Sequence, residues 1–199
     1  MGILSSLTNR RIRNTLVYLL CVLLFAPLHS AVADSSNRPK KETKLKALIL
    51  YQAPKLIGWQ TPAKQEAPVF RYCILDDPYL KQVLTGILDG KKSAGKPIDI
   101  VSFDENDPSQ NCHILYIAHD SQMNGNNSAI GLFKRLQDEG VLIVGSNAAI
   151  ITMGGHVSLN SFRNKIGFEI SEDLLLGHQF KLNSRLAGFA TIIKSKKLE

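Results

Sequence analysis

Two short apolar runs constrain the fold of this chain more than any other feature: residues 113–118, His-Ile-Leu-Tyr-Ile-Ala, and residues 141–144, Val-Leu-Ile-Val. Each run is too short for an ordinary helix and too apolar for either face to meet water, which is typical of a strand in the middle of a sheet. Between them, residues 129–139 have helical spacing and stop at Gly140, a common residue just after a helix end. Two buried strands joined by a helix predict a parallel pair.

The same alternation extends along most of the chain. Before these runs, the spacing predicts a helix over 43–59 that Pro54 should kink or split, and Asp76-Asp77-Pro78 predicts a helix start after a strand. The remaining predicted elements are strands at 69–75 and 97–103, a helix at 79–88, a hairpin of strands 156–159 and 166–170, a helix starting at 172–176, and a last helix with an apolar stripe from 182 to 193. We therefore predict an α/β fold: a mainly parallel central sheet flanked by helices on both faces, with a C-terminal antiparallel hairpin.

Residues 1–33 have the three parts of a secretory signal peptide. Three arginines precede an apolar stretch at 16–27, and Ala31-Val32-Ala33 forms a small-residue exit that predicts cleavage before Asp34. The alternative is an uncleaved membrane anchor, which needs roughly 20 apolar residues. Pro27 ends the apolar stretch earlier than that. We expect an exported protein, which in a bacterium means one located in the periplasm.

The rest of the chain is expected to hold one domain. Residues 34–42 are polar and predict a flexible start, residues 43–194 a single α/β domain, and residues 195–199 a basic tail. The leader contains three arginines and no acidic residue, so its removal lowers the formal net charge from +7 to +4. A surplus this small, without interleaved basic and aromatic residues, disfavours a nucleic-acid partner.

Cleavage would leave Cys73 and Cys112 as the cysteines of the mature chain. An even number of cysteines in an oxidising compartment predicts a disulfide. A metal site built on these thiols is disfavoured because neither has another cysteine within four residues. Closing a loop of about 40 residues should stabilise the fold by about 4 kcal/mol.

We find no motif that predicts catalysis, a cofactor or a metal. Gly154-Gly155 precedes a strand instead of a helix, so a tight turn is preferred to a phosphate cradle. Ser146 follows a strand but lacks the surroundings of a nucleophile, and a helix cap explains it better. The mature chain's histidines, at positions 113, 119, 156 and 178, show no ligand spacing. We therefore expect a protein that is not an enzyme.

The order of several motifs resembles one protein family. A lysine- and leucine-containing helix that ends at a tryptophan is followed by R-Y-C-I-L at 71–75, C-H-I-L-Y-I at 112–117 and V-L-I-V at 141–144. Gly154-Gly155, N-K-I-G-F-E-I-S at 164–171 and L-x-x-R-L-A at 182–187 complete the series. Over residues 44–193 this order resembles the YfiR-like family of periplasmic proteins.

The resemblance implies a non-enzymatic repressor. YfiR-like proteins bind the periplasmic sensor region of an inner-membrane diguanylate cyclase, and so lower cyclic di-GMP synthesis and biofilm formation. It also implies a homodimer, a disulfide on Cys73 and Cys112, and contact with the membrane only through the partner. Some members carry a second cysteine pair near residues 144–147, where this chain has none. Redox control by such a pair is therefore not expected here.

A repressor without catalytic groups has to bind one state of its target better than another, which predicts an exposed apolar surface. We expect the helix of residues 43–59, the closing hairpin and the last predicted helix to supply it. The residues predicted to contact the partner are Trp59, Phe162, Phe168 and Glu169. Two alternatives stay open at this point. The protein could bind a small ligand in the periplasm, which would require a deep pocket with converging polar groups, or serve as an adaptor for another membrane sensor such as a histidine kinase.

Overall fold

The structure is a computed structural model. It describes residues 37–107, 110–118, 127–162, 165–178, 180–188 and 190–193, all of which belong to one compact unit, Ser36–Glu199. The predicted signal peptide at 1–33 and basic tail at 195–199 lie outside these residues, so both stay predictions.

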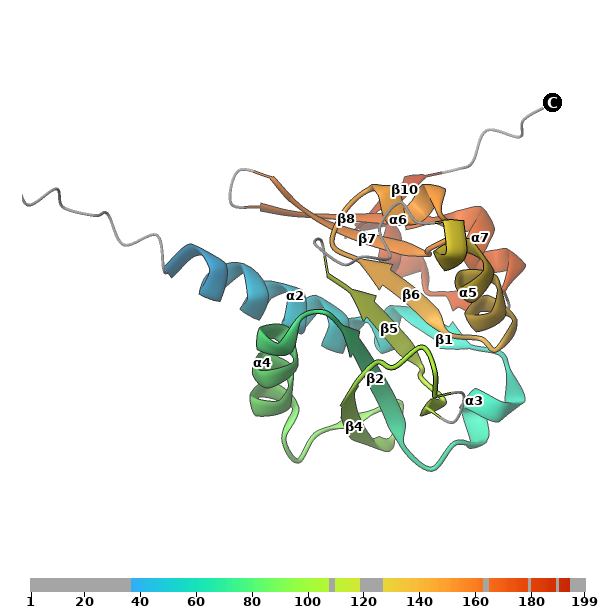
Figure 1. Cartoon of the computed structure of the whole chain (residues 1–199), viewed down its shortest axis with the longest axis horizontal. Coiled ribbons are helices and arrows are strands. Elements are labelled where there is room, and N and C mark those ends of the chain that lie inside the picture. Colours follow the sequence, from blue (N-terminus) through green and yellow to red (C-terminus); the bar gives the residue numbers. More distant parts are fainter. Residues whose placement is uncertain are drawn as a thin grey trace, which may run out of the picture. The chain divides into compact units, whose positions relative to one another are not determined.

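An eight-stranded sheet forms the centre of this unit, with strand order β10-β8-β7-β6-β5-β2-β4-β3 (Figure 1). The five strands from β4 to β7 are mutually parallel, and β10 is parallel to β8, whereas β7/β8 and β3/β4 are antiparallel pairs. The strands are β2 (Phe70–Leu75), β3 (Lys92–Ser93), β4 (Lys96–Ser102), β5 (Ile114–Ile117), β6 (Leu142–Gly145), β7 (Val157–Phe162), β8 (Lys165–Ser171) and β10 (Thr191–Ile193). The predicted fold class is confirmed.

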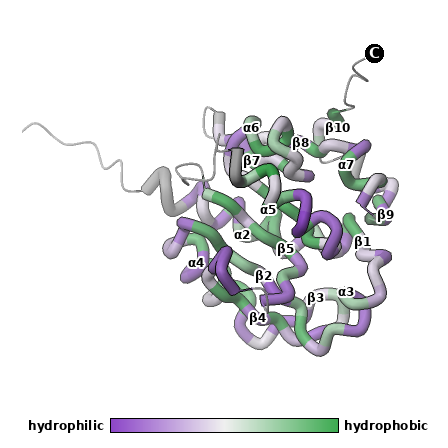
Figure 2. Tube along the Cα trace, turned by 45° about the vertical axis from the view of Figure 1, so that its right-hand side comes forward, coloured by the Kyte–Doolittle hydropathy of each residue, from purple (hydrophilic) through white to green (hydrophobic). Residues whose placement is uncertain are grey.

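The sheet separates two apolar clusters because successive side chains of a strand point to opposite faces. On one face, Tyr72, Ile114 and Leu142 pack with the buried side of two helices, α2 (Asn37–Leu56) and α4 (Pro78–Leu88). On the other face, the alternate strand residues pack against α5 (Asn127–Asp138) and α6 (Ala149–Thr152). The most hydrophobic stretches of the trace accordingly run through the central strands (Figure 2).

Local signals in the sequence account for several element boundaries. The carboxylate of Asp77 accepts a hydrogen bond from the backbone N–H of Leu80 at 2.8 Å and caps the start of α4, as the acidic–proline motif predicts. Gly140 follows α5 with a φ of +72°, which favours glycine, so the predicted helix end is confirmed.

The N-terminal helix differs from the prediction at both ends. It begins at Asn37, so it includes residues 37–42 of the expected flexible start. Pro39 lies in the first turn, where the missing N–H costs no helical hydrogen bond, and Glu42 forms an ion pair with Lys46 at 2.7 Å. Pro54 does not split the helix but lies in its last turn.

Residues 57–59, predicted as helix, instead form strand β1 (Ile57–Trp59), which pairs antiparallel with β9 (Phe180–Leu182). The predicted last helix over 182–193 is also wrong. After the short helix α7 (Glu172–Gly177), this part of the chain forms β9, a 3₁₀ turn (Ser184–Gly188) and strand β10. Pairing with Ile57 and Trp59, more than 100 positions earlier, overrides the apolar spacing that favours a helix.

Candidate functional site

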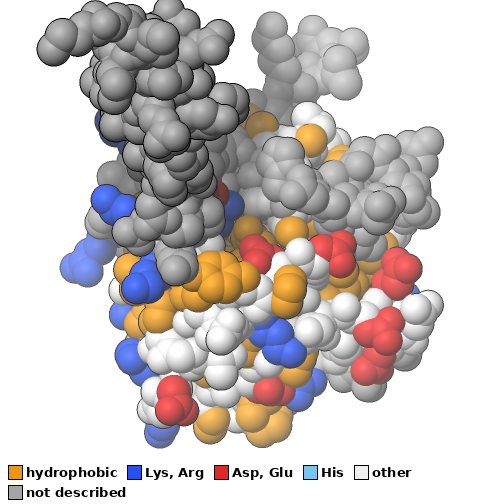
Figure 3. Space-filling view, turned by 60° about the vertical axis from the view of Figure 1, so that its left-hand side comes forward, with side chains coloured by type: hydrophobic (Ala, Val, Ile, Leu, Met, Phe, Trp, Pro, Cys, Tyr) orange, Lys and Arg blue, Asp and Glu red, His pale blue; other side chains and the backbone are white. Residues whose placement is uncertain are grey.

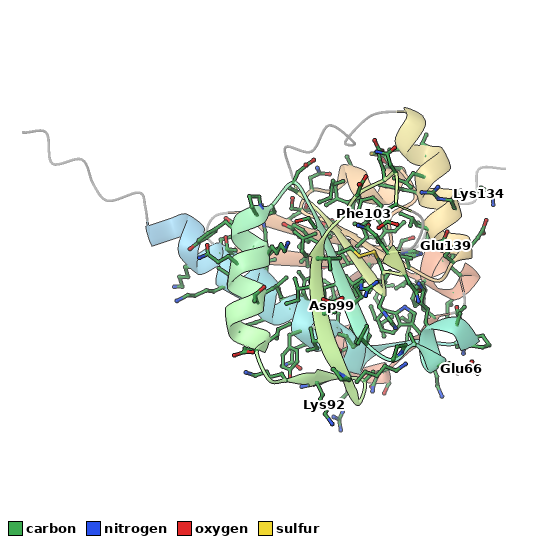
Figure 4. The ribbon with its side chains drawn as sticks, turned by 60° about the horizontal axis from the view of Figure 1, so that its bottom comes forward. Glu66, Lys92, Asp99, Phe103, Lys134 and Glu139 are labelled. Carbon is green, nitrogen blue, oxygen red and sulfur yellow. A yellow bond between two sulfur atoms is a disulfide. The ribbon has the colours of Figure 1, made fainter. Side chains whose placement is uncertain are left out.

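Cys73 and Cys112 form the disulfide, with their Cα atoms 5.8 Å apart. Both cysteines are buried in the cluster under α5, beside Val101 and Phe103 (Figure 4). The bond joins β2 to the segment that leads into β5, so it ties two neighbouring strands of the sheet together. It is a structural bond within the core.

His113 stands just before β5 and completes the hydrogen bonding between two strands. Its backbone N–H donates to the carbonyl of Arg71, and the backbone N–H of Arg71 donates back to its Nδ1 at 3.2 Å. Nε2 therefore carries the proton and donates to the carbonyl of Lys64 at 3.1 Å. Burial, with the nearby positive charges of Lys64, Lys96 and Arg71, lowers the pKa of His113 to about 4.

A polar network surrounds His113. Lys64 is 3% exposed and donates to the amide oxygen of Asn111 at 2.6 Å, and its burial lowers its pKa to about 8 although Glu139 opposes the shift. Arg71 forms an ion pair at 2.8 Å with Asp99, which lies on β4 (Figure 4). The contacts of Lys64 with Asn111 and His113 hold the helix α3 (Pro62–Glu66) against the sheet, so the burial of this lysine has a structural explanation.

His156 makes the same pair of hydrogen bonds between β6 and β7 that His113 makes between β2 and β5. Just before β7, its backbone N–H donates to the carbonyl of Ile143, and the backbone N–H of Ile143 donates to its Nδ1 at 3.0 Å. The ring is fully buried, and its Nε2 contacts Nδ1 of His178 at 3.2 Å. Burial, helped by His178, lowers the pKa of His156 to about 3. Both histidines thus serve as neutral hydrogen-bond acceptors for a strand.

Trp59 lies in β1 and packs inward. Its ring contacts Phe70 and Phe180 edge to face, with centroids 5.1 and 5.8 Å apart, and its Nε1 donates to the carbonyl of Gly140 at 2.9 Å. The side chain is partly buried against the main core. These contacts give Trp59 a structural role, and contact with a partner stays a prediction.

The other predicted contact residues lie in the β7–β8 hairpin. Phe168 faces the core across from Leu159, whereas Glu169 points to the opposite face and is only partly exposed. Phe162 ends β7, but its side chain is outside the part of the structure that is described. Phe168 and Glu169 are therefore neighbours in sequence whose side chains lie on opposite faces of the hairpin. Trp59 belongs to a separate two-stranded sheet, so these three residues do not form one surface.

The exposed apolar surface of the predicted docking helix belongs to other residues. Leu45 and Leu48 on α2 are 41% and 45% exposed, and Lys41 and Lys44 beside them are exposed too. Figure 3 brings forward the side where α2 begins and shows hydrophobic side chains next to lysines. Helical spacing marked both leucines as apolar, but only packing decides which stripe of a helix faces the sheet.

A cavity of about 640 Å³ opens where β6 ends, and sequence analysis missed it. Its lining comes from α2, the end of β6 and the hairpin: Glu42, Lys46, Ser146, Asn147, Asn160, Ser161, Gly167 and Glu169. Most of these are ordinary surface residue types that no motif connects. Apart from their common position at strand ends and on one helix, no sequence signal could have grouped them.

Neither a metal site nor a membrane-spanning helix is present among the described residues. They contain no cluster of three or more histidine, cysteine or acidic side chains placed to hold a metal ion. Within the same residues, no helix combines the length and the hydropathy needed to cross a bilayer.

The fold and the disulfide define a mixed α/β domain with a mostly parallel sheet and one covalent bond in its core. The family model described as YfiR/HmsC-like matches residues 43–191, about three quarters of the chain. The chain therefore belongs to the YfiR/HmsC-like family, and the resemblance seen in the sequence is confirmed. Membership connects it with periplasmic regulation of diguanylate cyclase signalling. No curated protein matches the chain.

Proposed function

We propose that this protein is an exported, non-enzymatic repressor that binds the periplasmic sensor region of an inner-membrane diguanylate cyclase and lowers cyclic di-GMP synthesis. The observation that carries the proposal is family membership across residues 43–191. The predicted signal peptide at 1–33 supports export, because it would deliver the domain to the compartment where such a sensor region lies.

A repressor of this kind works by differential binding. It shifts the cyclase toward an inactive state only by as much as it binds that state more tightly than the active one. A tenfold population shift needs about 1.4 kcal/mol of differential affinity. Leu45 and Leu48 are 41% and 45% exposed, so burying the exposed part of both against the inactive state alone supplies about 1.3–2.6 kcal/mol.

We place the docking surface on the outward stripe of α2, which contains Leu45 and Leu48 flanked by Lys41 and Lys44. This is the helix expected to dock, with leucines in place of Trp59 as the apolar anchors. Exposed leucines next to lysines suit a partner surface that is apolar with an acidic rim. A homodimer, which the family resemblance implies, would have to leave this stripe accessible in the active repressor.

Site-specific photocrosslinking tests the partner and the surface together. A photoreactive residue at position 48 should capture a membrane protein with a diguanylate cyclase domain. The matched control is position 130 on α5, where Ile130 is 52% exposed on the other face of the sheet. Capture of a histidine kinase would favour the adaptor alternative, and identical products from both positions would contradict the proposed surface.

A further inference from the structure

The cavity at the end of β6 has the position of a ligand site. In open α/β sheets, ligands bind outside the carboxyl ends of the parallel strands. Strand β6 ends at Gly145, whereas its parallel neighbour β7 is paired with it only through Ser158 and continues to Phe162. The overhanging hairpin and α2 therefore border a space that no strand fills and that is open to solvent on one side. A volume of about 640 Å³ lies within the range of small-molecule sites.

The α2 part of the cavity lining contains an ion pair, Glu42 with Lys46, whose charges cancel. Glu42 lies 2.7 Å from Nζ of Lys46 and also accepts a hydrogen bond from the hydroxyl of Ser161 at 2.5 Å. Burial raises the pKa of Glu42, but the hydrogen bonds from Lys46 and Ser161 and the charge of Lys46 outweigh it, so the pKa is lowered and the carboxylate stays ionised. This wall offers hydrogen bonds but no net charge.

The hairpin part of the lining carries a net negative charge, which comes from Glu169. Glu169 accepts one hydrogen bond, from the amide of Asn160 at 2.8 Å, and forms no ion pair with any cation among the residues that the structure describes. A carboxylate that has one hydrogen bond and no ion pair favours a ligand that brings a positive charge and hydrogen-bond donors.

The end of β6 supplies neutral groups. The hydroxyl of Ser146 hydrogen-bonds with the side chain of Tyr116 and lies 3.5 Å from the carbonyl of Ile117, so it keeps only part of its hydrogen-bonding capacity for a ligand. The side-chain oxygen of Asn147 accepts from the backbone N–H of Ile150 at 3.2 Å, so its amide N–H₂ is the group left to donate. These groups pair with hydroxyl or carbonyl oxygens of a ligand.

We propose that this cavity binds a small amine that also carries several hydroxyl groups, with its ammonium on Glu169 and its hydroxyls between Ser146, Asn147 and the Glu42–Lys46 wall. The single uncompensated carboxylate disfavours anionic ligands such as nucleotides or dicarboxylates. The proposal stands apart from the proposed function, since it concerns binding by the isolated protein.

Three probes separate the two features of the ligand. D-glucosamine has both an ammonium and hydroxyls, D-glucose has hydroxyls alone, and spermidine has ammonium groups alone. In NMR titrations of the purified protein, glucosamine should give saturable chemical-shift changes in β7 and β8 and bind about tenfold more tightly than either other probe, because it alone combines a charged group for Glu169 with hydroxyls for the neutral groups.

Two variants with matched controls test the site. Glu169→Gln should weaken glucosamine binding about tenfold and leave glucose binding unchanged, whereas Glu66→Gln, an exposed carboxylate on α3, should alter neither. Gly167→Leu should abolish binding of all probes by filling the cavity. The fold should tolerate it, because a Cβ at this position meets no atom closer than 3.7 Å. Gly86→Leu on the exposed side of α4 is its control.

Three results would overturn the proposal. They are the absence of saturable glucosamine binding, equal affinity for spermidine or glucose, and binding that survives Gly167→Leu. Thermal melts of each variant show whether a loss of binding comes from unfolding. None of these outcomes depends on the membrane partner, so a failure here leaves the proposed repressor function to its own test.

Discussion

Acidification from about pH 7.5 to about pH 5 should destabilise this protein through two buried histidines. Each accepts a backbone N–H on Nδ1, from Arg71 in the case of His113 and from Ile143 in the case of His156. Protonation of Nδ1 turns the acceptor into a donor and removes that hydrogen bond. The native state therefore holds both rings neutral, with a pKa of about 4 for His113 and about 3 for His156.

The sign and the size follow from linkage. Because both folded pKa values lie below the unfolded value of about 6.5, the unfolded chain binds more protons between about pH 6.5 and about pH 4. Stability is complete above about pH 6.5 and falls as the pH drops. One pH unit costs about 1.4 kcal/mol for each histidine, so at about pH 5 each costs about 2 kcal/mol and both about 4 kcal/mol.

Urea unfolding at a series of pH values measures this loss. The His156→Asn variant is the sharpest comparison, since the side-chain oxygen of asparagine can take the place of Nδ1 as an acceptor without titrating. The free energy of unfolding of the variant should fall by about 2 kcal/mol less than that of the wild type across the same pH range. Equal pH dependence in both proteins, or a wild-type stability that does not change between about pH 6.5 and about pH 5, would refute the reasoning.

Three further changes test the core. Replacing Cys73 and Cys112 together by alanine should lower the free energy of unfolding by about 4 kcal/mol, from the loop of separation 39 that the bond closes, and mass spectrometry after alkylation without reductant should find no free thiol at either position. Trp59→Ala should cost about 3 kcal/mol and reduce repression only in step with stability; lost repression at an unchanged melting temperature would instead assign Trp59 to the partner. Gly155→Ala should cost about 1–3 kcal/mol because its Cβ would lie 2.5 Å from Ile150, whereas Gly131→Ala, with open space around it, should cost nothing.

The central sheet could be predicted because its signals are local. The runs at 113–118 and 141–144 are apolar on both faces, and Asp77 and Gly140 mark helix ends through side-chain and backbone chemistry that neighbouring residues determine. The pair of strands β1 and β9 could not be predicted in this way. Each has three residues, and what selects the strand conformation is a partner more than 100 positions away.

The candidate sites show the same division. The disulfide could be predicted because the mature chain is expected to keep two cysteines and to be exported to an oxidising compartment. In contrast, which stripe of α2 is exposed depends on how the helix packs, and the cavity joins Lys46, Asn147 and Glu169 across about 120 positions of sequence. The sequence predicts Glu169 as a partner contact, but a single strand cannot show that Asn160 and an unfilled space lie beside it.

Cyclic di-GMP in the host tests the repressor function most directly. A strain that lacks this gene should contain more cyclic di-GMP and attach more to surfaces, and the wild-type gene should reverse both effects. The double variant Leu45→Gln/Leu48→Gln should be exported and folded but should not restore repression. The control Ile130→Gln/Leu176→Gln, which changes two apolar side chains elsewhere that are more exposed than Leu45 and Leu48, should restore it fully. Unchanged cyclic di-GMP in the deletion strain, with the candidate cyclase still present, would contradict the proposed function.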